Sequence, residues 1–312
     1  MKTWIKELED INFGPGKYSQ SYQDVLLEQI FKNTGTKNST PFCVELGFNA
    51  PSLSGGSGAN VAKLILDRKW DSLLLDGGNE NTEIGLHKHF LTPNNICELF
   101  RKYEVPKEPE YISIDVDSTD LWLFEAVVKQ YRAMVFSVEY NSHYPLQAAI
   151  TFPNDQNEHW QGDRGYGASL KALNIVAESN GYSLLWVVPC LDAIFVRNDL
   201  IEDGTGEICF PFEKWNSCTS MVCHKPLIDR KRVGIFMDYE VYLSTKGDVE
   251  ESRRAAIPVC RKVLLDSVFR HIARKSKQHI PRKLKQIVRK LIRPNKSVDR
   301  TALRPPVTST FA

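Results

Sequence analysis

Residues 42–47 read Phe-Cys-Val-Glu-Leu-Gly, and the chain continues as Phe-Asn-Ala-Pro-Ser-Leu-Ser-Gly-Gly-Ser-Gly through residue 58. The first part is a short apolar run of the kind that forms a buried parallel strand. The loop that follows is rich in Gly and Ser, and residues 59–66 then place apolar side chains at helical spacing. A strand, a loop and a helix in this order are typical of α/β domains, so the stretch predicts that fold class.

The same alternation of strands and helices continues along the chain. Strands are expected at 72–76, 111–115, 133–139, 182–188 and 193–196, with a weak candidate at 88–91. Helices are expected at 93–103, 119–130 and 168–179, and an amphipathic helix at 19–31 leads into the domain. The pattern predicts one α/β domain over residues 19–200, with a doubly wound, mostly parallel, Rossmann-like sheet.

Functional residues are expected just after each strand, because a ligand of an open α/β sheet sits outside the carboxyl ends of its strands. An acid such as Asp76 at the end of the second strand can accept hydrogen bonds from a ribose diol, and Gly47 lets backbone approach a ligand. Both features suit a nucleoside. The residues at these strand ends are Glu45, Gly47, Asp76 to Asn79, Thr92 to Asn95, Asp115, Asp117 and Glu139 to Asn141.

A phosphate-binding loop is the feature that the sequence lacks. The tight GxGxxG turn places a pyrophosphate at a helix N-terminus, and the Gly-Gly-Ser-Gly of residues 55–58 does not match its spacing. This absence counts against an NAD-dependent oxidoreductase and against a nucleotide-phosphate site.

The order of several short segments resembles a known family. The pieces are Ser19-Gln20 with Gln23-Asp24, residues 42–47, residues 70–76, Asn95-Ile96, residues 112–117 with Asp120, residues 138–141, residues 166–170, and Gly181-Tyr182 before residues 193–197. Each piece alone is weak evidence, and their shared order carries the likeness. Over about residues 18–200 the chain resembles the FkbM-type S-adenosylmethionine-dependent methyltransferases.

The resemblance implies a seven-stranded sheet whose last strand is antiparallel. It also implies methyl transfer from S-adenosylmethionine, usually to a hydroxyl oxygen of a sugar or a secondary metabolite. By position in the family pattern, Glu45 and Gly47 would line the methionine part, Asp76 would bind the ribose hydroxyls, and the turn from Thr92 to Asn95 would face the adenine. Asp115 and Asp117 would lie at the methionine amine and the reacting centre.

One loop departs from the family pattern. Where the family continues its first glycine with an Asp-Gly type of turn, this chain has Gly47-Phe-Asn-Ala-Pro51, and the later Asp-Gly of the fourth strand motif is Asp117-Ser118. A bulky Phe48 and a rigid Pro51 could reshape the cofactor loop. The alternative function is therefore a catalytically degenerate methyltransferase fold that serves as a binding or membrane-associated scaffold.

Three residues are candidate bases for removing the proton of a methyl acceptor: Asp117, Glu139 and His143. Asp117 shares its strand end with Asp115, and such pairing can raise the pKa of one carboxyl group. Helix capping near Thr119 is the structural alternative for the two aspartates, and a solvated loop position is the alternative for His143.

The same acids could instead hold a divalent cation. Asp115, Asp117, Asp120, Glu139 and Asn141 offer hard oxygen ligands from neighbouring strand ends, which suit magnesium or calcium. Farther along, Ser169 is expected to cap the next helix or to position it on the sheet, with contact to the acceptor as the alternative.

The charge of the chain is unevenly distributed. From Arg261 to the end there are 15 basic and 2 acidic residues, whereas residues 1–260 hold 25 basic and 36 acidic ones. We expect a lead-in at 1–18, a loop-rich extension at 201–258, basic amphipathic helices at 259–293 and a disordered tail at 294–312. The basic helices could pack on the domain, lie on an anionic membrane or contact nucleic acid, of which the last is least favoured because of the regular apolar stripe.

A cytoplasmic location is expected. No apolar run approaches the roughly 18 to 20 residues of a membrane span, and the first ten residues lack the apolar run of a signal peptide. Seven scattered cysteines agree with a reducing compartment. Association with a membrane surface through the basic helices would be peripheral.

Overall fold

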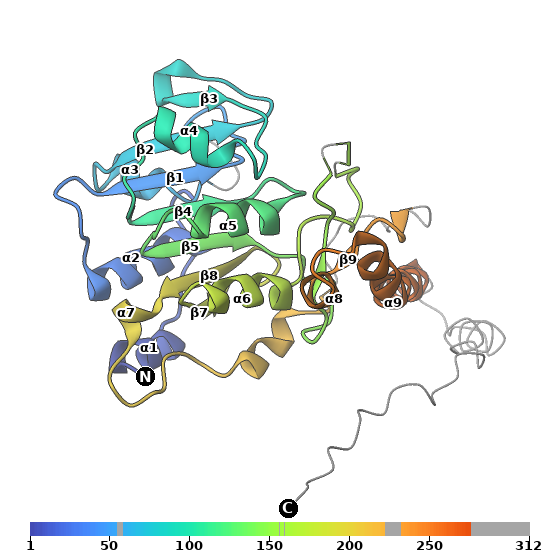
Figure 1. Cartoon of the computed structure of the whole chain (residues 1–312). Helices are drawn as coiled ribbons and strands as arrows, with labels where there is room; N and C mark the ends of the chain where they lie inside the picture. Colours follow the sequence, from blue (N-terminus) through green and yellow to red (C-terminus); the bar gives the residue numbers. More distant parts are fainter. Residues whose placement is uncertain (55–58, 156, 159, 222–231, 276–312) are drawn as a thin grey trace, which may run out of the picture. The chain divides into compact units, whose positions relative to one another are not determined.

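The structure is a computed structural model of the chain, and it describes residues 1–54, 59–155, 157–158, 160–221 and 232–275. At its centre lies a seven-stranded sheet with the order β3-β2-β1-β4-β5-β8-β7 (Figure 1). Strands β3, β2, β1, β4 and β5 are mutually parallel, whereas β8 runs antiparallel to both β5 and β7. The strands are β1 Phe42–Leu46, β2 Asp71–Asp76, β3 Leu86–Lys88, β4 Tyr111–Ile114, β5 Val135–Glu139, β7 Tyr182–Val187 and β8 Asp192–Arg197. The expected α/β class with a mostly parallel sheet is confirmed.

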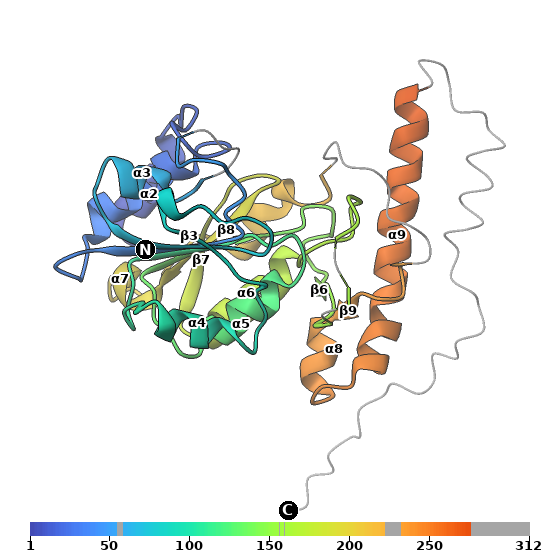
Figure 2. The ribbon, with the colours of Figure 1, turned by 90° about the horizontal axis from the view of Figure 1, so that it is seen from above.

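Helices cover both faces of the sheet. Helices α2 (Gln23–Thr34) and α3 (Ala62–Leu66) lie on one face, and α4 (Ile96–Lys102), α5 (Asp120–Val128) and α6 (Leu170–Ser179) lie on the other (Figure 2). Ser169 caps α6 as expected, because its hydroxyl accepts a hydrogen bond from the Ala172 N–H. The shorter elements of the domain are α1 Thr3–Glu7, α7 Asn198–Ile201 and the 3₁₀ turns Leu8–Asp10, Thr82–Ile84 and Phe212–Cys218.

Alternation along each strand separates two apolar cores. In β1, Cys43 packs with α2 and α3, whereas Val44 and Leu46 pack with α4 and α5 on the other face. Burial of each such side chain contributes about 1.5–3 kcal/mol. Both faces of the central strands are therefore apolar, as expected for parallel strands covered on two sides.

The same alternation leaves a polar layer near the carboxyl ends of the strands. Glu45 follows Cys43 by two residues and so lies on the α2–α3 face, as do Ser113 two residues after Tyr111 and Glu139 four residues after Val135. Asp192, two residues before Ile194, joins this face from β8. These buried polar side chains gather at one end of one face, which marks that end as the site.

The extension beyond residue 200 is more ordered than expected. Strand β9 (Met237–Asp238) pairs with β6 (Ile150–Thr151), and helices α8 (Tyr239–Ser244) and α9 (Val249–Lys275) follow. A third apolar cluster joins β6 to α9 through Phe152, Phe236 and Cys260. Asp238 and Asp248 accept hydrogen bonds from backbone N–H groups in the first turns of α8 and α9, which explains where these helices begin.

The chain divides after Leu264 into two units, and the fold above belongs to the first, Met1–Leu264. Helix α9 begins ten residues before the basic helix expected from Val259 and continues through Pro258. The remaining basic segment from 276 to 293 and the tail from 294 to 312 lie outside the described residues. Within the described residues, no helix has both the length and the apolar character needed to cross a membrane.

Candidate functional site

The order of the strands reverses between β1 and β4, and this switch point is where an α/β sheet opens a crevice. Gly47 lies at that point with a positive φ of 88°, and its N–H donates to the Leu75 carbonyl oxygen. A Cβ atom on Gly47 would overlap the carbonyl oxygen of Asp115 and would lie 2.7 Å from its carbonyl carbon. Only glycine therefore allows β1 and β4 to come together here.

Two pockets open at this edge. The first encloses about 240 Å³, and the second encloses about 580 Å³. They share Gly47, Asn49, Asp115 and Asp117 as a common wall. Among the described residues that line them, neither pocket contains Lys, Arg or His, whereas each contains five carboxyl side chains. These are Asp76, Asp115, Asp117, Asp155 and Glu158 in the first, and Glu45, Asp115, Asp117, Glu139 and Asp192 in the second.

Asp76 lies in the wall of the first pocket at the end of β2. Its Oδ1 atom accepts hydrogen bonds from the N–H groups of Gly78 at 2.8 Å and Asn79 at 2.6 Å, and from Asn79 Nδ2 at 2.9 Å. Its Oδ2 atom makes no hydrogen bond with the part of the chain that the structure describes. One oxygen thus fixes the turn, and the other is available to a ligand.

The turn after β3 forms another part of the wall of the first pocket. Phe90, Leu91, Thr92 and Pro93 line it, and the Phe90 side chain is 65% exposed. Asn95 does not itself line the pocket. Its side chain instead stabilises the turn by hydrogen bonds to the backbone. The Asn95 Oδ1 accepts from the Thr92 N–H at 2.8 Å, and the Nδ2 donates to the Phe90 carbonyl oxygen at 2.8 Å.

Glu45 is buried at the end of β1, in the wall of the second pocket. Its two carboxyl oxygens accept hydrogen bonds from the N–H groups of Asn60 and Val61, each at 3.1 Å. Burial raises the pKa of Glu45 to about 8; these two hydrogen bonds favour the charged form, and the charge of Asp192 disfavours it. Glu45 therefore anchors the start of α3 to the sheet as well as lining the pocket.

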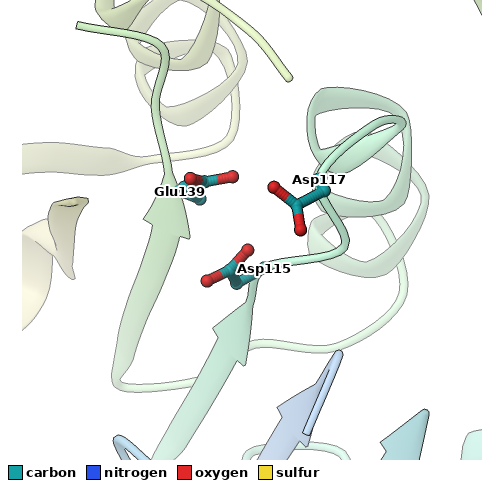
Figure 3. Close-up of side chains that lie close together, drawn as sticks. All are labelled: Asp115, Asp117 and Glu139. Carbon is teal, nitrogen blue, oxygen red and sulfur yellow. The ribbon is translucent and has the colours of Figure 1, made fainter. Parts of the chain in front are cut away.

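Three carboxyl groups meet where the two pockets join. Asp115 follows β4, Asp117 lies in the loop after it and Glu139 ends β5, and their side chains point toward one another (Figure 3). One oxygen from each lies within 4.8 Å of the other two. Asp117 has a positive φ of 57°, a strained conformation for a residue other than glycine, and such strain is often found at functional sites.

The surroundings of Asp115 disfavour its charged form. Water can reach it through the pocket, yet protein atoms surround it closely. This desolvation raises its pKa well above the ordinary value, and the charges of Asp120, Asp192 and Asp117 raise it further. The pKa of Asp115 is therefore raised even though the side chain is exposed to the pocket.

Two buried acids beside the cluster have structural partners. Asp120 Oδ1 accepts a hydrogen bond from the Val116 N–H at 2.7 Å, and burial raises the pKa of Asp120 to about 7. Asp192 Oδ2 accepts from Gln23 Nε2 at 3.2 Å and from Asn60 Nδ2 at 3.1 Å, while burial raises its pKa. Both add negative charge to the site when ionised.

The donor set for a divalent cation is only partly assembled. Asp115, Asp117 and Glu139 lie close enough to share one ion. Of the other two expected ligands, Asp120 lies outside this group and its Oδ1 accepts from the Val116 N–H, and Asn141 Oδ1 accepts from the His143 N–H at 3.0 Å. Three carboxyl groups therefore fit a cation, and the five-residue set does not form.

His143 is not among the residues that line the two pockets. It is buried, its Nδ1 lies 3.0 Å from Asn141 Oδ1, and it lines neither pocket. The alternative of a solvated loop histidine is wrong, because only 5% of the residue is exposed. Its expected role as a base stays a prediction.

Several pocket residues were not expected from the sequence. Asn60, Phe90, Trp160 and Asp192 all line a pocket. Asp192 could have been found, because an antiparallel last strand brings its first residue, not its last, to the carboxyl edge of its neighbours. Trp160 comes from the long connection between β6 and α6, and its sequence carries no signal for a pocket position.

The chain matches no model of a known protein family, and no curated protein matches it.

Proposed function

We propose that this protein is an S-adenosylmethionine-dependent O-methyltransferase that acts on a hydroxyl group of a glycan or a small metabolite. The observation that carries the proposal is the pair of adjoining pockets at the switch point, which are lined by carboxyl groups and by no basic side chain among the described residues. S-adenosylmethionine brings a sulfonium and an ammonium group against one carboxylate, so it suits such a site.

The charge of the pockets argues against cofactors that carry phosphate. A pyrophosphate would have to lie among several acidic side chains without a lysine or an arginine in the described lining to offset it. The sequence also lacks the glycine-rich phosphate loop. Both points favour a nucleoside cofactor that is free of phosphate.

The first pocket has the features that an adenosine group needs. The Oδ2 of Asp76, which makes no hydrogen bond with the described residues, can accept hydrogen bonds from the two ribose hydroxyls, and the exposed Phe90 ring offers an apolar face for the base. Glu45, Gly47 and Asp115 continue from this point along the shared wall into the second pocket. The methionine part would follow them.

The arrangement of the sheet supports the family resemblance. That resemblance implies seven strands with the last one antiparallel, and β8 is the last strand of the sheet along the chain and runs against β5 and β7. In the loop that departs from the family pattern, Phe48 and Ala50 line the second pocket, and Phe48 packs in the apolar core of the α2–α3 face with 1% exposure.

The bound sulfonium would supply the methyl group: its S–CH₃ bond breaks with the electron pair kept by sulfur, while the acceptor oxygen forms the new bond and loses its proton. Asp117 and Glu139 are the acids placed to receive that proton, because they face each other across the junction of the pockets. The raised pKa of Asp115 favours its neutral form relative to an ordinary aspartic acid.

Isothermal titration with S-adenosylmethionine and S-adenosylhomocysteine tests the proposal. The variant Asp76→Asn should weaken both ligands about 10- to 150-fold, since a hydrogen bond to a charged group contributes about 1.5–3 kcal/mol. Asp71→Asn is the matched control, because Asp71 begins the same strand at the opposite edge and is exposed. No binding by the wild type at millimolar ligand would refute the proposal and favour the scaffold alternative.

A further inference from the structure

The turn after β2 is tied to the loop after β1 by two asparagine side chains. Asn79 Nδ2 donates to Asn49 Oδ1 at 3.2 Å, and Asn81 Nδ2 donates to the Pro51 carbonyl oxygen at 3.1 Å. The loop that receives these hydrogen bonds, residues 47–51, is the one that departs from the family pattern. Asn49 in this loop belongs to the wall that the two pockets share. The turn after β2 therefore helps to fix that wall.

Asn79 also holds the carboxylate of Asp76. The Nδ2 atom that binds Asn49 donates to Asp76 Oδ1 at 2.9 Å as well, and the backbone N–H of Asn79 donates to the same oxygen at 2.6 Å. The amide nitrogen carries two N–H groups, so it can serve both side-chain acceptors at once. Because a carboxylate only accepts hydrogen bonds, the nitrogen of Asn79 and not its oxygen must face Asp76. Asn79 thus joins the carboxylate of the first pocket to the shared wall.

These contacts hold one carboxyl oxygen of Asp76 and leave the other for a ligand. Oδ1 accepts from Gly78 and Asn79, whereas Oδ2 makes no hydrogen bond with the part of the chain that the structure describes. A side chain that is ordered before binding lowers the entropic cost that a ligand must offset. Asn79 itself lines neither pocket. Its effect on a ligand would therefore pass through Asp76.

We propose that Asn79 is a positioning residue for the first pocket, where it orients the Asp76 carboxylate for the vicinal diol of a ribose. This role rests on the proposed function, because it takes Asp76 to bind the ribose hydroxyls. Asn81 offers a comparison within the same turn, since it ties Pro51 but makes no hydrogen bond to Asp76 among the described residues. The two asparagines therefore separate orientation of the carboxylate from anchoring of the loop.

Adenosine and 2′,3′-dideoxyadenosine test this proposal, because they differ only in the two ribose hydroxyls. Isothermal titration with each nucleoside is carried out on the full chain, and S-adenosylhomocysteine is titrated in parallel. The wild type should bind adenosine at least about tenfold more tightly than the dideoxy nucleoside, as expected for hydrogen bonds to a charged group. The ratio of the two affinities, called the diol preference below, reports the contact with Asp76.

Substitutions of Asn79 separate a positioning role from a structural one. Asn79→Ala should lower the diol preference about two- to tenfold, because a carboxylate that is no longer held must be ordered when the ribose binds. Asn79→Asp keeps the shape of the side chain but places a second carboxylate against Asp76, so it should have the larger effect. In the Asp76→Asn background, Asn79→Ala should leave the diol preference unchanged. A purely structural role for Asn79 would weaken both nucleosides together.

Asn81→Ala is the matched control. It removes the tie to Pro51 and keeps the hydrogen bonds of Asp76, so the diol preference should stay at the value of the wild type. An equal loss of the diol preference in Asn81→Ala and Asn79→Ala would overturn the positioning role in favour of loop anchoring.

The parallel titrations separate this role from the proposed function. Binding of S-adenosylhomocysteine together with an unchanged diol preference in both Asn79 variants would overturn the positioning role and leave the methyltransferase proposal in place. A diol preference that falls in the Asn79 variants, without binding of S-adenosylhomocysteine by the wild type, would do the opposite. A wild type that shows no diol preference would also overturn the positioning role, since Asp76 would then bind no diol.

Discussion

Replacing Gly47 by alanine probes the approach of β1 to β4. Two costs are expected. A residue with a Cβ atom at a φ of 88° destabilises the folded state by about 1–2 kcal/mol. The overlap with the Asp115 carbonyl group can be relieved only by a shift of packed backbone, which costs about 1–3 kcal/mol more. The free energy of unfolding should therefore fall by about 2–5 kcal/mol. Equilibrium unfolding in urea, followed by tryptophan fluorescence, measures this change.

Gly85→Ala is the matched control for this experiment. Gly85 also has a positive φ, 70°, but a Cβ atom there would meet nothing within 4 Å. The loss of stability in Gly85→Ala therefore measures the backbone strain without a steric overlap. Alanine also reduces the conformational entropy of the unfolded chain, and this effect is common to both variants. A loss of stability in Gly47→Ala within about 0.5 kcal/mol of that in Gly85→Ala would refute the packing argument.

Two further predictions concern buried polar groups near the site. The pKa of Glu45 is about 8 in the folded protein, against 4.5 for an ordinary glutamic acid. Between pH 4.5 and 8 the folded protein therefore keeps a proton on Glu45 that the unfolded chain has released. The stability that protonated Glu45 contributes falls as the pH rises through this window. The glutamine of Glu45→Gln does not titrate. The difference in free energy of unfolding between the wild type and this variant should therefore shrink from pH 5 to pH 8. A difference that stays constant in urea unfolding would contradict burial as the cause of the raised pKa of Glu45. Ser169→Ala should destabilise the protein by about 2–4 kcal/mol, because the Ser169 hydroxyl accepts from the buried N–H groups of both Ile150 and Ala172. Ser179→Ala, at the exposed end of the same helix, is the control, and equal losses in the two variants would rule out the double cap.

The sheet was predictable because the strand signals are local. Apolar runs such as residues 42–46 specify strands that are buried on both faces, and the acids and glycines after them mark the carboxyl edge. The cap at Ser169 was predictable for the same reason, because a cap depends on a few adjacent residues. Asp238 and Asp248 offered similar cap signals for α8 and α9, although the glycines and polar residues around them favoured a loop-rich interpretation.

The walls of the pockets were harder to predict because they depend on contacts between distant segments. Trp160 reaches the second pocket through a loop that is held by Arg232, some seventy residues later. Asn95 stands where a ligand contact was expected, yet its amide is engaged with the backbone of its own turn. Sequence position identified a turn that lines the first pocket, and hydrogen bonding decided which of its side chains lie in that lining.

The negative charge of the site follows from the direction of one strand. In a parallel strand the carboxyl edge is formed by the last residues, which include Glu45 on β1, Asp76 on β2 and Glu139 on β5. Because β8 is antiparallel, its first residue, Asp192, lies opposite Glu139 and brings another carboxyl group to the same edge. A parallel β8 would have placed Arg197 there instead, with a positive charge beside Glu139. The concentration of carboxyl groups at this edge is therefore a consequence of the topology as much as of the composition.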